Sequence, residues 1–316
     1  MSSRTRPLLA SVTVAVIFGF SFLFTKGTLN YLTPFQLLGL RFALAALFMS
    51  LLAACRLIEV RIRSADLPEL LGIAFWQPVL YFVFETYGVK LTSASESGVV
   101  IAMVPVAVAV LSGIFLREKI NPAQAGFISA AVAGVVLMTL GAPAGGGLES
   151  GSHLAGIALL SGAVLAAGFY SIFSRNAAAR HEPEKITFVM MWLGAVVFNA
   201  AGLFQSYSSG LLGNYLQAAR QLPVVFGLLY LGLLSSVCAF FLTNYALSRL
   251  PASRMAVFLN LTPVVSVLAG IIFFQERLSL PQLAGGLLIL AGVWGTNHFA
   301  GELPEERKEA REKHAL

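Results

Sequence analysis

The sequence predicts an all-α membrane protein with ten transmembrane helices, arranged as two inverted five-helix repeats around a central cavity. Three observations predict this fold class: an apolar composition, apolar segments of membrane-spanning length and an internal repeat. Hydrophobic residues make up 57% of the 316 positions and charged residues only 11%, where ordinary soluble domains carry roughly 25% charge. The net charge of +6 comes from residues at segment ends, and that distribution argues against a nucleic-acid-binding patch.

Ten apolar segments are each long enough to cross a bilayer as a helix, which takes about 20 residues. No small-residue cleavage site follows the first segment, so we interpret it as an uncleaved span and not as a signal peptide. The chain then divides into a first repeat (1–141), a Gly/Ser-rich linker (142–153), a second repeat (154–300) and a cytoplasmic tail (301–316). The predicted spans are about 8–28, 34–55, 67–88, 94–116, 121–141, 154–174, 185–206, 222–247, 253–274 and 280–300.

Basic residues are distributed unevenly over the predicted loops. With a cytoplasmic N-terminus, the cytoplasmic loops and tail hold most of the Lys and Arg residues, as the positive-inside rule requires. Omitting one span would invert every later loop and remove this asymmetry. The pattern therefore predicts a multi-pass protein of the cell inner (cytoplasmic) membrane with both termini in the cytoplasm. The basic residues expected on the outer side are Lys26, Lys90, Arg220 and Arg277.

The two halves of the chain repeat each other. A shift of 158 positions, without a gap, places Pro105 on Pro263 and Glu118 on Glu276, and the first spans match at a shift of 149. Apolar composition alone makes helices look alike, but it does not account for matching charges and prolines. Because five is an odd number, consecutive five-span halves cross the membrane in opposite senses. Such an inverted repeat is typical of secondary transporters and favours transport over catalysis.

Two stretches of the repeat carry a resemblance to a known family. In both, a proline-bearing span ends in an aromatic residue and Glu, and a short loop opens the next span: MVPVAVAVLSGIFLREKINPAQAGFISAAVAGVVLM and NLTPVVSVLAGIIFFQERLSLPQLAGGLLILAGVW. Over residues 8–300 the chain resembles the EamA family of the drug/metabolite transporter superfamily. The resemblance implies ten spans, cytoplasmic termini and a cavity lined by spans 1, 3, 4, 6, 8 and 9. It also implies export of amino acids or other metabolites, or movement of nucleotide-sugars, drugs or choline.

Three charged residues stand out because they lie deeper in the predicted spans than the charges at the span ends, and charge inside a membrane is costly and usually retained for function. Arg41 lies two turns into the second span, Glu85 one turn before the end of the third, and Glu96 one turn into the fourth. All three are expected in the outer third of the bilayer, as one polar cluster that serves in coupling or gating. A structural ion pair, or snorkelling to the interface, is the alternative.

The third span has a predicted polar stripe, because Gln77, Tyr81 and Glu85 are spaced i, i+4 and i+8. Aromatic, amide and hydroxyl groups near the midplane suit a neutral or zwitterionic organic solute better than a metal ion, which would need several carboxylate, His or Cys ligands. Packing or interfacial anchoring is the alternative for any single ring. The candidate substrate-binding residues are Phe20, Trp76, Gln77, Tyr81, Tyr170, Ser235 and Asn260.

Pro105 and Pro263 each lie near the middle of a span, at matching positions of the repeat. Proline removes an intrahelical hydrogen bond and introduces a kink. Matching kinks in matching helices predict hinges, and a static bend that shapes the bundle is the alternative.

We therefore expect a secondary transporter that moves small organic metabolites, amino acids or related solutes, by alternating access, in the direction of export. A multidrug, organic-cation or lipid-carrier transporter of the same fold is the alternative. A membrane-embedded enzyme would need a set of catalytic residues in its spans, such as paired aspartates. The only Asp, Asp66, lies in a predicted loop. No cofactor or metal is expected. The expected partners are the small-molecule substrate, protons and the lipid bilayer, in a monomer or homodimer without nucleic acid.

Overall fold

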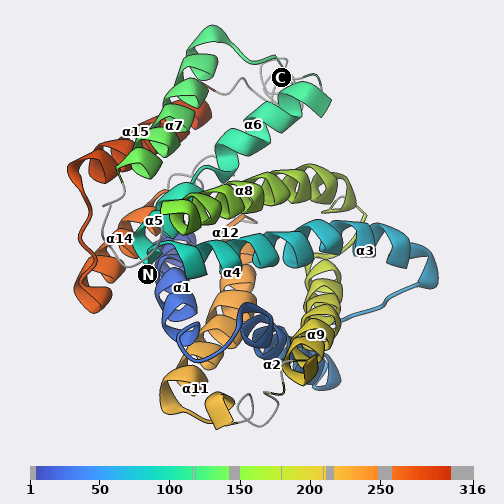
Figure 1. The fold of residues 1–316 in the computed structure, drawn as a ribbon. Coiled ribbons are helices and arrows are strands. Elements are labelled where there is room, and N and C mark those ends of the chain that lie inside the picture. Colours follow the sequence, from blue (N-terminus) through green and yellow to red (C-terminus); the bar gives the residue numbers. More distant parts are fainter. Residues whose placement is uncertain are drawn as a thin grey trace, which may run out of the picture.

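The computed structural model describes residues 5–115, 117, 119–141, 150–178, 180–208, 210, 217–247 and 258–299. Within these residues the regular structure is entirely helical (Figure 1). The π-helical segments Phe75–Leu80 and Tyr230–Cys238 join α3 to α4 and α11 to α12. The helices are α1 (Thr5–Thr28), α2 (Pro34–Ala54), α3 (Leu67–Ala74), α4 (Tyr81–Leu91), α5 (Ala94–Ile101), α6 (Val104–Phe115), α7 (Pro122–Leu140), α8 (Ser150–Ala178), α9 (Pro183–Ser208), α11 (Leu222–Leu229), α12 (Ala239–Leu247), α14 (Leu261–Phe274) and α15 (Leu280–His298).

Eight helical stretches of the described chain are long and apolar enough to cross a membrane, which confirms a multi-pass α-helical protein. The ninth and tenth predicted spans correspond to α14, which has 14 residues, and to α15, which has 19. These two are not among the eight. The eight stretches are Arg6–Thr28, Pro34–Ala54, Ser64–Leu91, Ala94–Phe115, Pro122–Leu140, Gly151–Ser174, Pro183–Ser208 and Leu222–Thr243.

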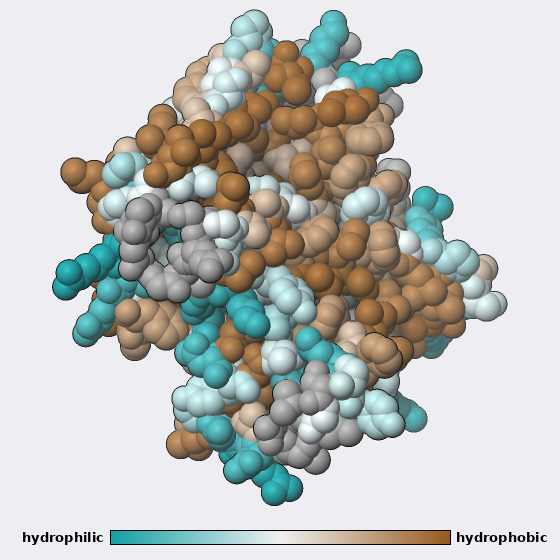
Figure 2. All heavy atoms as spheres, viewed as in Figure 1, coloured by the Kyte–Doolittle hydropathy of each residue, from teal (hydrophilic) through white to brown (hydrophobic). Residues whose placement is uncertain are grey.

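The surface agrees with an apolar environment. Figure 2 shows hydrophobic residues over much of the visible face, with hydrophilic residues along parts of its outline and across its lower part. Large apolar side chains such as Leu47, Phe204 and Leu287 are exposed. Lipid can cover such side chains, provided that the backbone polar groups are bonded within helices.

Polar caps start several of the helices. A Ser, Thr or Asn side chain precedes the first turn and accepts the backbone N–H three residues later, which satisfies a donor that has no partner inside the helix. Two of these caps, Asn121 and Ser279, are 158 positions apart. Each also donates to the carbonyl at the end of the other's helix: Asn121 to Phe299 at 2.6 Å and Ser279 to Gly141 at 2.5 Å. The capping pairs are Thr33 with Gln36, Ser93 with Glu96, Asn121 with Gln124 and Ser279 with Gln282.

The helices pack in matched pairs. The second predicted span packs on the seventh (α2 on α9), the fifth on the tenth (α7 on α15) and the fourth on the ninth (α5 on α14). Two further pairings occur twice: α1 packs on α12 and α14, while α8 packs on α4 and α6. Every one of these contacts therefore has a counterpart when each span is exchanged for the span five places away.

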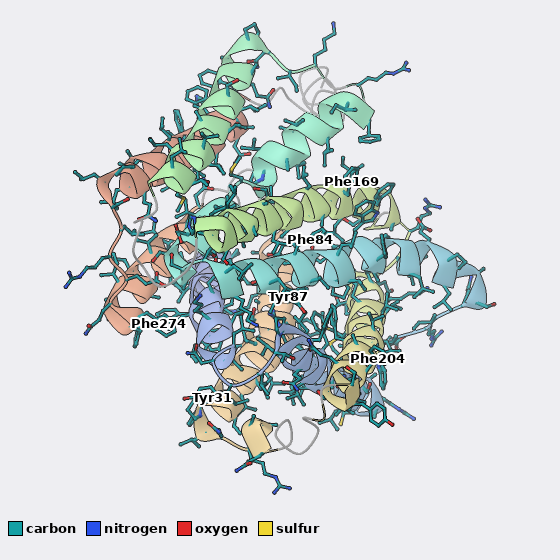
Figure 3. The ribbon with its side chains drawn as sticks, viewed as in Figure 1. Tyr31, Phe84, Tyr87, Phe169, Phe204 and Phe274 are labelled. Carbon is teal, nitrogen blue, oxygen red and sulfur yellow. The ribbon has the colours of Figure 1, made fainter. Side chains whose placement is uncertain are left out.

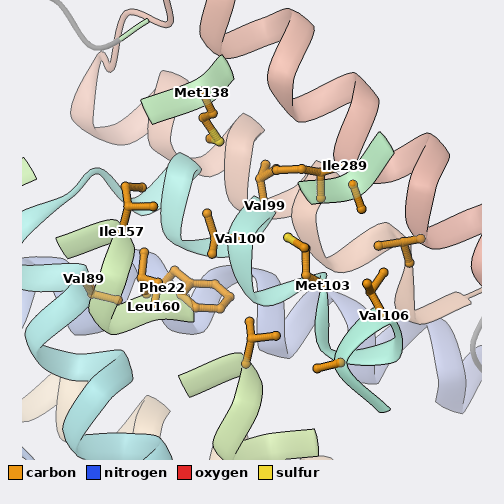
Figure 4. Close-up of a cluster of buried hydrophobic side chains, with 14 of the residues drawn as sticks. Phe22, Val89, Val99, Val100, Met103, Val106, Met138, Ile157, Leu160 and Ile289 are labelled. Atoms are coloured by element: carbon orange, nitrogen blue, oxygen red, sulfur yellow. The ribbon is translucent and has the colours of Figure 1, made fainter. Parts of the chain in front are cut away.

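A buried cluster at the centre joins the two halves. Phe22 of α1 lies among Val99 and Val100 of α5, Leu160 of α8 and Ile289 of α15 (Figure 4). The cluster therefore holds the first part of span 4 against helices from both ends of the chain.

Candidate functional site

Arg41 is buried inside the bundle, with 4% of its surface exposed. Its Nε donates to Ser236 Oγ at 3.1 Å and its Nη2 to Ser235 Oγ at 3.4 Å. The guanidinium carbon lies 4.4 Å from the centre of the Phe82 ring and 5.8 Å from that of Phe42, a cation–π arrangement. The structure thus places Arg41 beside Ser235, one of the predicted substrate-binding residues.

Glu85 lies on α4 close to this guanidinium and is 3% exposed. Its Oε2 accepts from Thr86 Oγ1 at 3.1 Å. Arg41 and Tyr81 interact with it electrostatically. The described side chains nevertheless form no ion pair to Glu85 within 4 Å. Its carboxylate is therefore buried with one neutral donor and a nearby cation that it does not touch.

Glu96 occupies a different setting, although it is also 3% exposed. Its Oε1 lies 2.9 Å from His153 Nε2 on α8 and accepts from Gln282 Nε2 on α15 at 2.7 Å. Its Oε2 accepts the backbone N–H of Ser93 at 3.0 Å. The expectation of one cluster with Arg41 is therefore wrong, because depth in a span does not specify which neighbour a helix faces. His153 is 57 positions from Glu96 in the sequence, so no local spacing signals this contact.

The predicted stripe along span 3 is interrupted. Gln77 has φ −144° and ψ 117° inside the π-helical segment, so the four-residue spacing to Tyr81 does not place the two side chains on one helical face. Pro78, which lacks an N–H, is the sequence signal for this break. Tyr81 and Glu85 both lie on α4 and remain one turn apart.

Aromatic rings from three spans meet around Trp76. Its indole stacks on Phe169 with centroids 4.4 Å apart and on Phe173 at 6.1 Å. Phe115 meets Phe169 edge-on at 5.6 Å, and Figure 3 labels Phe169 on α8. Sequence analysis singled out Trp76 but missed Phe169, Phe173 and Phe115. The signal for Phe169 was available, because it falls on Phe20 in the repeat.

Three of the other predicted substrate-binding residues have contacts or positions outside this aromatic group. Tyr170 donates its hydroxyl to Met190 Sδ at 3.8 Å. Phe20 meets Phe273 edge-on at 6.2 Å. Asn260 lies in the turn just before α14 and is partly buried. The seven residues are therefore spread over several elements.

Both predicted kinks are present. Span 4 breaks at Ala102–Met103, between α5 and α6, and Pro105 lies in the first turn of α6. In span 9, Asn260 forms a turn and Pro263 lies in the first turn of α14. Whether these breaks act as hinges remains a prediction. Among the described residues, no group of three or more His, Cys, Asp or Glu could hold a metal ion.

Comparison with known proteins identifies the family. The model of the EamA-like transporter family matches residues 5–140 and again 154–297. The chain is 33% identical to the uncharacterized transporter YcxC of Bacillus subtilis over 294 residues, 93% of each chain. It is 26% identical to a probable terminal-alkyne amino-acid exporter of Streptantibioticus cattleyicolor over 74% of each chain.

A solved crystal structure shares the fold, with a TM-score of 0.60 and 21% identity, over 94% of this chain and 98% of the other. The resemblance predicted from the two long motifs is confirmed by the family match. Transporter relatives and eight apolar helices together indicate a multi-pass membrane protein. The chain belongs to the EamA-like transporter family.

Proposed function

We propose that the chain is a secondary transporter that exports small organic metabolites, amino acids or related solutes, by alternating access. The single observation that carries this proposal is the pair of broken helices, α5–α6 and the start of α14, at equivalent positions of the two halves. Two equivalent halves can exchange conformations and so open one site to either side of the membrane. On this proposal the site lies between the halves.

The arrangement of the helices supports an inverted repeat of ten spans. The matched contacts, the reciprocal bonds of Asn121 and Ser279, and the π-helical segments in spans 3 and 8 all relate residues near 158 positions apart. On this proposal α14 and α15 are the ninth and tenth spans. Both termini are then cytoplasmic, in the cell inner membrane.

The side chains support an organic solute with polar groups. Arg41, Ser235 and Glu85 offer a cation, a hydroxyl and a carboxylate, and Trp76 and Phe169 offer ring faces. A zwitterion such as an amino acid carries a group that complements each charge. One similar protein is named a probable amino-acid exporter. We propose coupling to protons through the buried carboxylates, with Glu85 as the first candidate.

The test uses purified full-length protein. A thermal-shift screen against amino acids and other metabolites selects solutes, and counterflow into proteoliposomes then measures saturable exchange of each one. We expect an amino acid or a close relative to raise the melting temperature and to exchange. If only planar organic cations exchange, the multidrug alternative replaces the proposed amino-acid export. Absence of saturable flux for every solute that raises the melting temperature would overturn it.

A further inference from the structure

The turn between α4 and α5, residues 91–95, is held by a cation from another span. Lys26, at the end of α1, donates its ammonium to the carbonyl oxygens of Val89 at 3.0 Å and Lys90 at 3.1 Å, and also to that of Thr92. These are the free carbonyls at the end of α4, where the helix dipole is negative. The cation is therefore matched to the end of the helix that it contacts.

An anion holds the other side of the same turn. Glu276, in the connection between α14 and α15, accepts the backbone N–H of Ala94 at 2.8 Å and that of Ser95 at 3.0 Å. The Ser95 hydroxyl donates to the same carboxylate at 2.5 Å. The start of α5 carries the positive end of the helix dipole. Glu276 therefore takes backbone and hydroxyl donors from another span, although its neighbour in the sequence is the cation Arg277.

The helices behind the turn leave no space between them. Ser266 of α14 donates to the carbonyl of Ala94 at 2.8 Å. A methyl group added at Gly98 would overlap Ser266, and one added at Gly270 would overlap both Glu276 and Ser95. Past the break in span 4, α6 packs on α8 and α15 and leads away from α14 (Figure 1). The described parts of the two spans are therefore sealed together on the side of the break that carries the turn.

We propose that Lys26 and Glu276 form a latch that closes the transport pathway at the membrane face where spans 3 and 4 are joined. The inference rests on the proposed alternating access, and the positive-inside orientation makes this the outer face. The clamped turn belongs to spans 3 and 4, while the two charges belong to span 1 and to the loop after span 9. Opening the pathway there separates these elements, so both charges must leave the turn.

The experiment measures the accessibility of two reporter cysteines in a chain whose own cysteines, Cys55 and Cys238, are replaced by serine. Ser266→Cys reports on the sealed side and Asn260→Cys on the other side of the break. A small charged methanethiosulfonate labels each reporter in proteoliposomes without solute. The latch variants are Glu276→Gln, Lys26→Met and the milder Ser95→Ala.

In the Glu276→Gln variant we expect the reagent to label Ser266→Cys about tenfold faster. Loss of a charge-assisted set of hydrogen bonds shifts the equilibrium between the closed and the open latch by at least that factor. Lys26→Met should act in the same direction and Ser95→Ala less strongly. The labelling rate of Asn260→Cys should fall in the same variants, because one side of the pathway closes as the other opens. Glu59→Gln, which removes the carboxylate of an exposed pair with Arg61, is the matched control and should change neither rate.

Two results would overturn the latch. One is an unchanged rate at Ser266→Cys in all three variants. The other is faster labelling there without slower labelling at Asn260→Cys, which indicates local loosening. Melting temperature and a monodisperse elution profile show that each variant is folded. The experiment needs no solute, so its failure is distinct from the absence of flux that would overturn the proposed function.

Discussion

Glu85 and Glu96 are buried to the same extent, yet the protein surrounds them differently. Glu96 accepts from donors on three elements: the Ser93 backbone, His153 on α8 and Gln282 on α15. Glu85 accepts from the hydroxyl of its neighbour Thr86, and the cation near it, Arg41, donates instead to two serines. Equal depth and equal burial therefore do not mean equal roles.

A buried carboxylate is stable when hydrogen-bond donors compensate for its lost hydration. Glu96 is compensated, and its bonds join spans 4, 6 and 10. Glu85 keeps acceptor capacity beside a cation that it does not touch. A bound proton or the ammonium group of a substrate would therefore be stabilised more at Glu85 than at Glu96. On the proposed proton coupling, Glu85 beside Arg41 is therefore the first candidate, and we propose that Glu96 holds helices together.

The largest effect that this comparison predicts is on stability. Glu96→Ala removes the acceptor shared by His153 and Gln282 and leaves the partly buried His153 and the buried Gln282 without it. We expect a loss of about 3 kcal/mol, the upper end of the cost of leaving a buried hydrogen-bonding group without its partner. Thermal unfolding in detergent measures it, with the exposed Glu59→Ala as control. A melting temperature equal to that of the control would contradict the structural role of Glu96.

One part of the Glu96 site has a local signal in the sequence, although Ser93, which supplies it, was not among the residues predicted. Ser93 and Glu96 form an S-x-x-E capping box, which is local and can be read from spacing. His153 lies 57 positions away and Gln282 186. Which of several helices faces α5 is decided by packing between spans, and hydropathy does not record it. The all-α, multi-pass class therefore followed from composition and segment length, while the partners of Glu96 did not.

The break in span 3 was only partly predictable. Pro78 signals a kink, but the π-helical segment that surrounds it moves Gln77 out of the expected stripe. The corresponding segment of span 8, Tyr230–Cys238, contains no proline. In this segment the α-helical hydrogen bonds are lost without a proline to signal the change. Only the match to span 3 in the repeat could have suggested the π-helical segment. Side-chain stripes drawn with ideal periodicity therefore fail at such positions.

Glu85→Gln should separate function from stability. The amide keeps the size of the side chain and can still accept from Thr86, so we expect unfolding to change by less than about 1 kcal/mol. Counterflow should fall at least about tenfold, because the carboxylate is the proposed coupling group and intramembrane charges are usually kept for function. The same proteoliposomes give flux at several pH values. Wild-type flux with unchanged pH dependence would remove Glu85 from the mechanism.

His153→Gln tests how specific the Glu96 site is. Glutamine is a neutral donor of a kind that the site already contains, since Gln282 makes the equivalent bond to the same oxygen at 2.7 Å. A second amide should therefore retain much of the bond, and we expect a loss below about 1 kcal/mol, within the range of a single hydrogen bond. His153→Ala, which leaves the oxygen with one side-chain donor fewer, should cost more. Thermal unfolding of the two variants side by side decides it. Equal losses would mean that the imidazole ring itself, through packing between α8 and α5, and not its hydrogen bond, stabilises this end of the bundle.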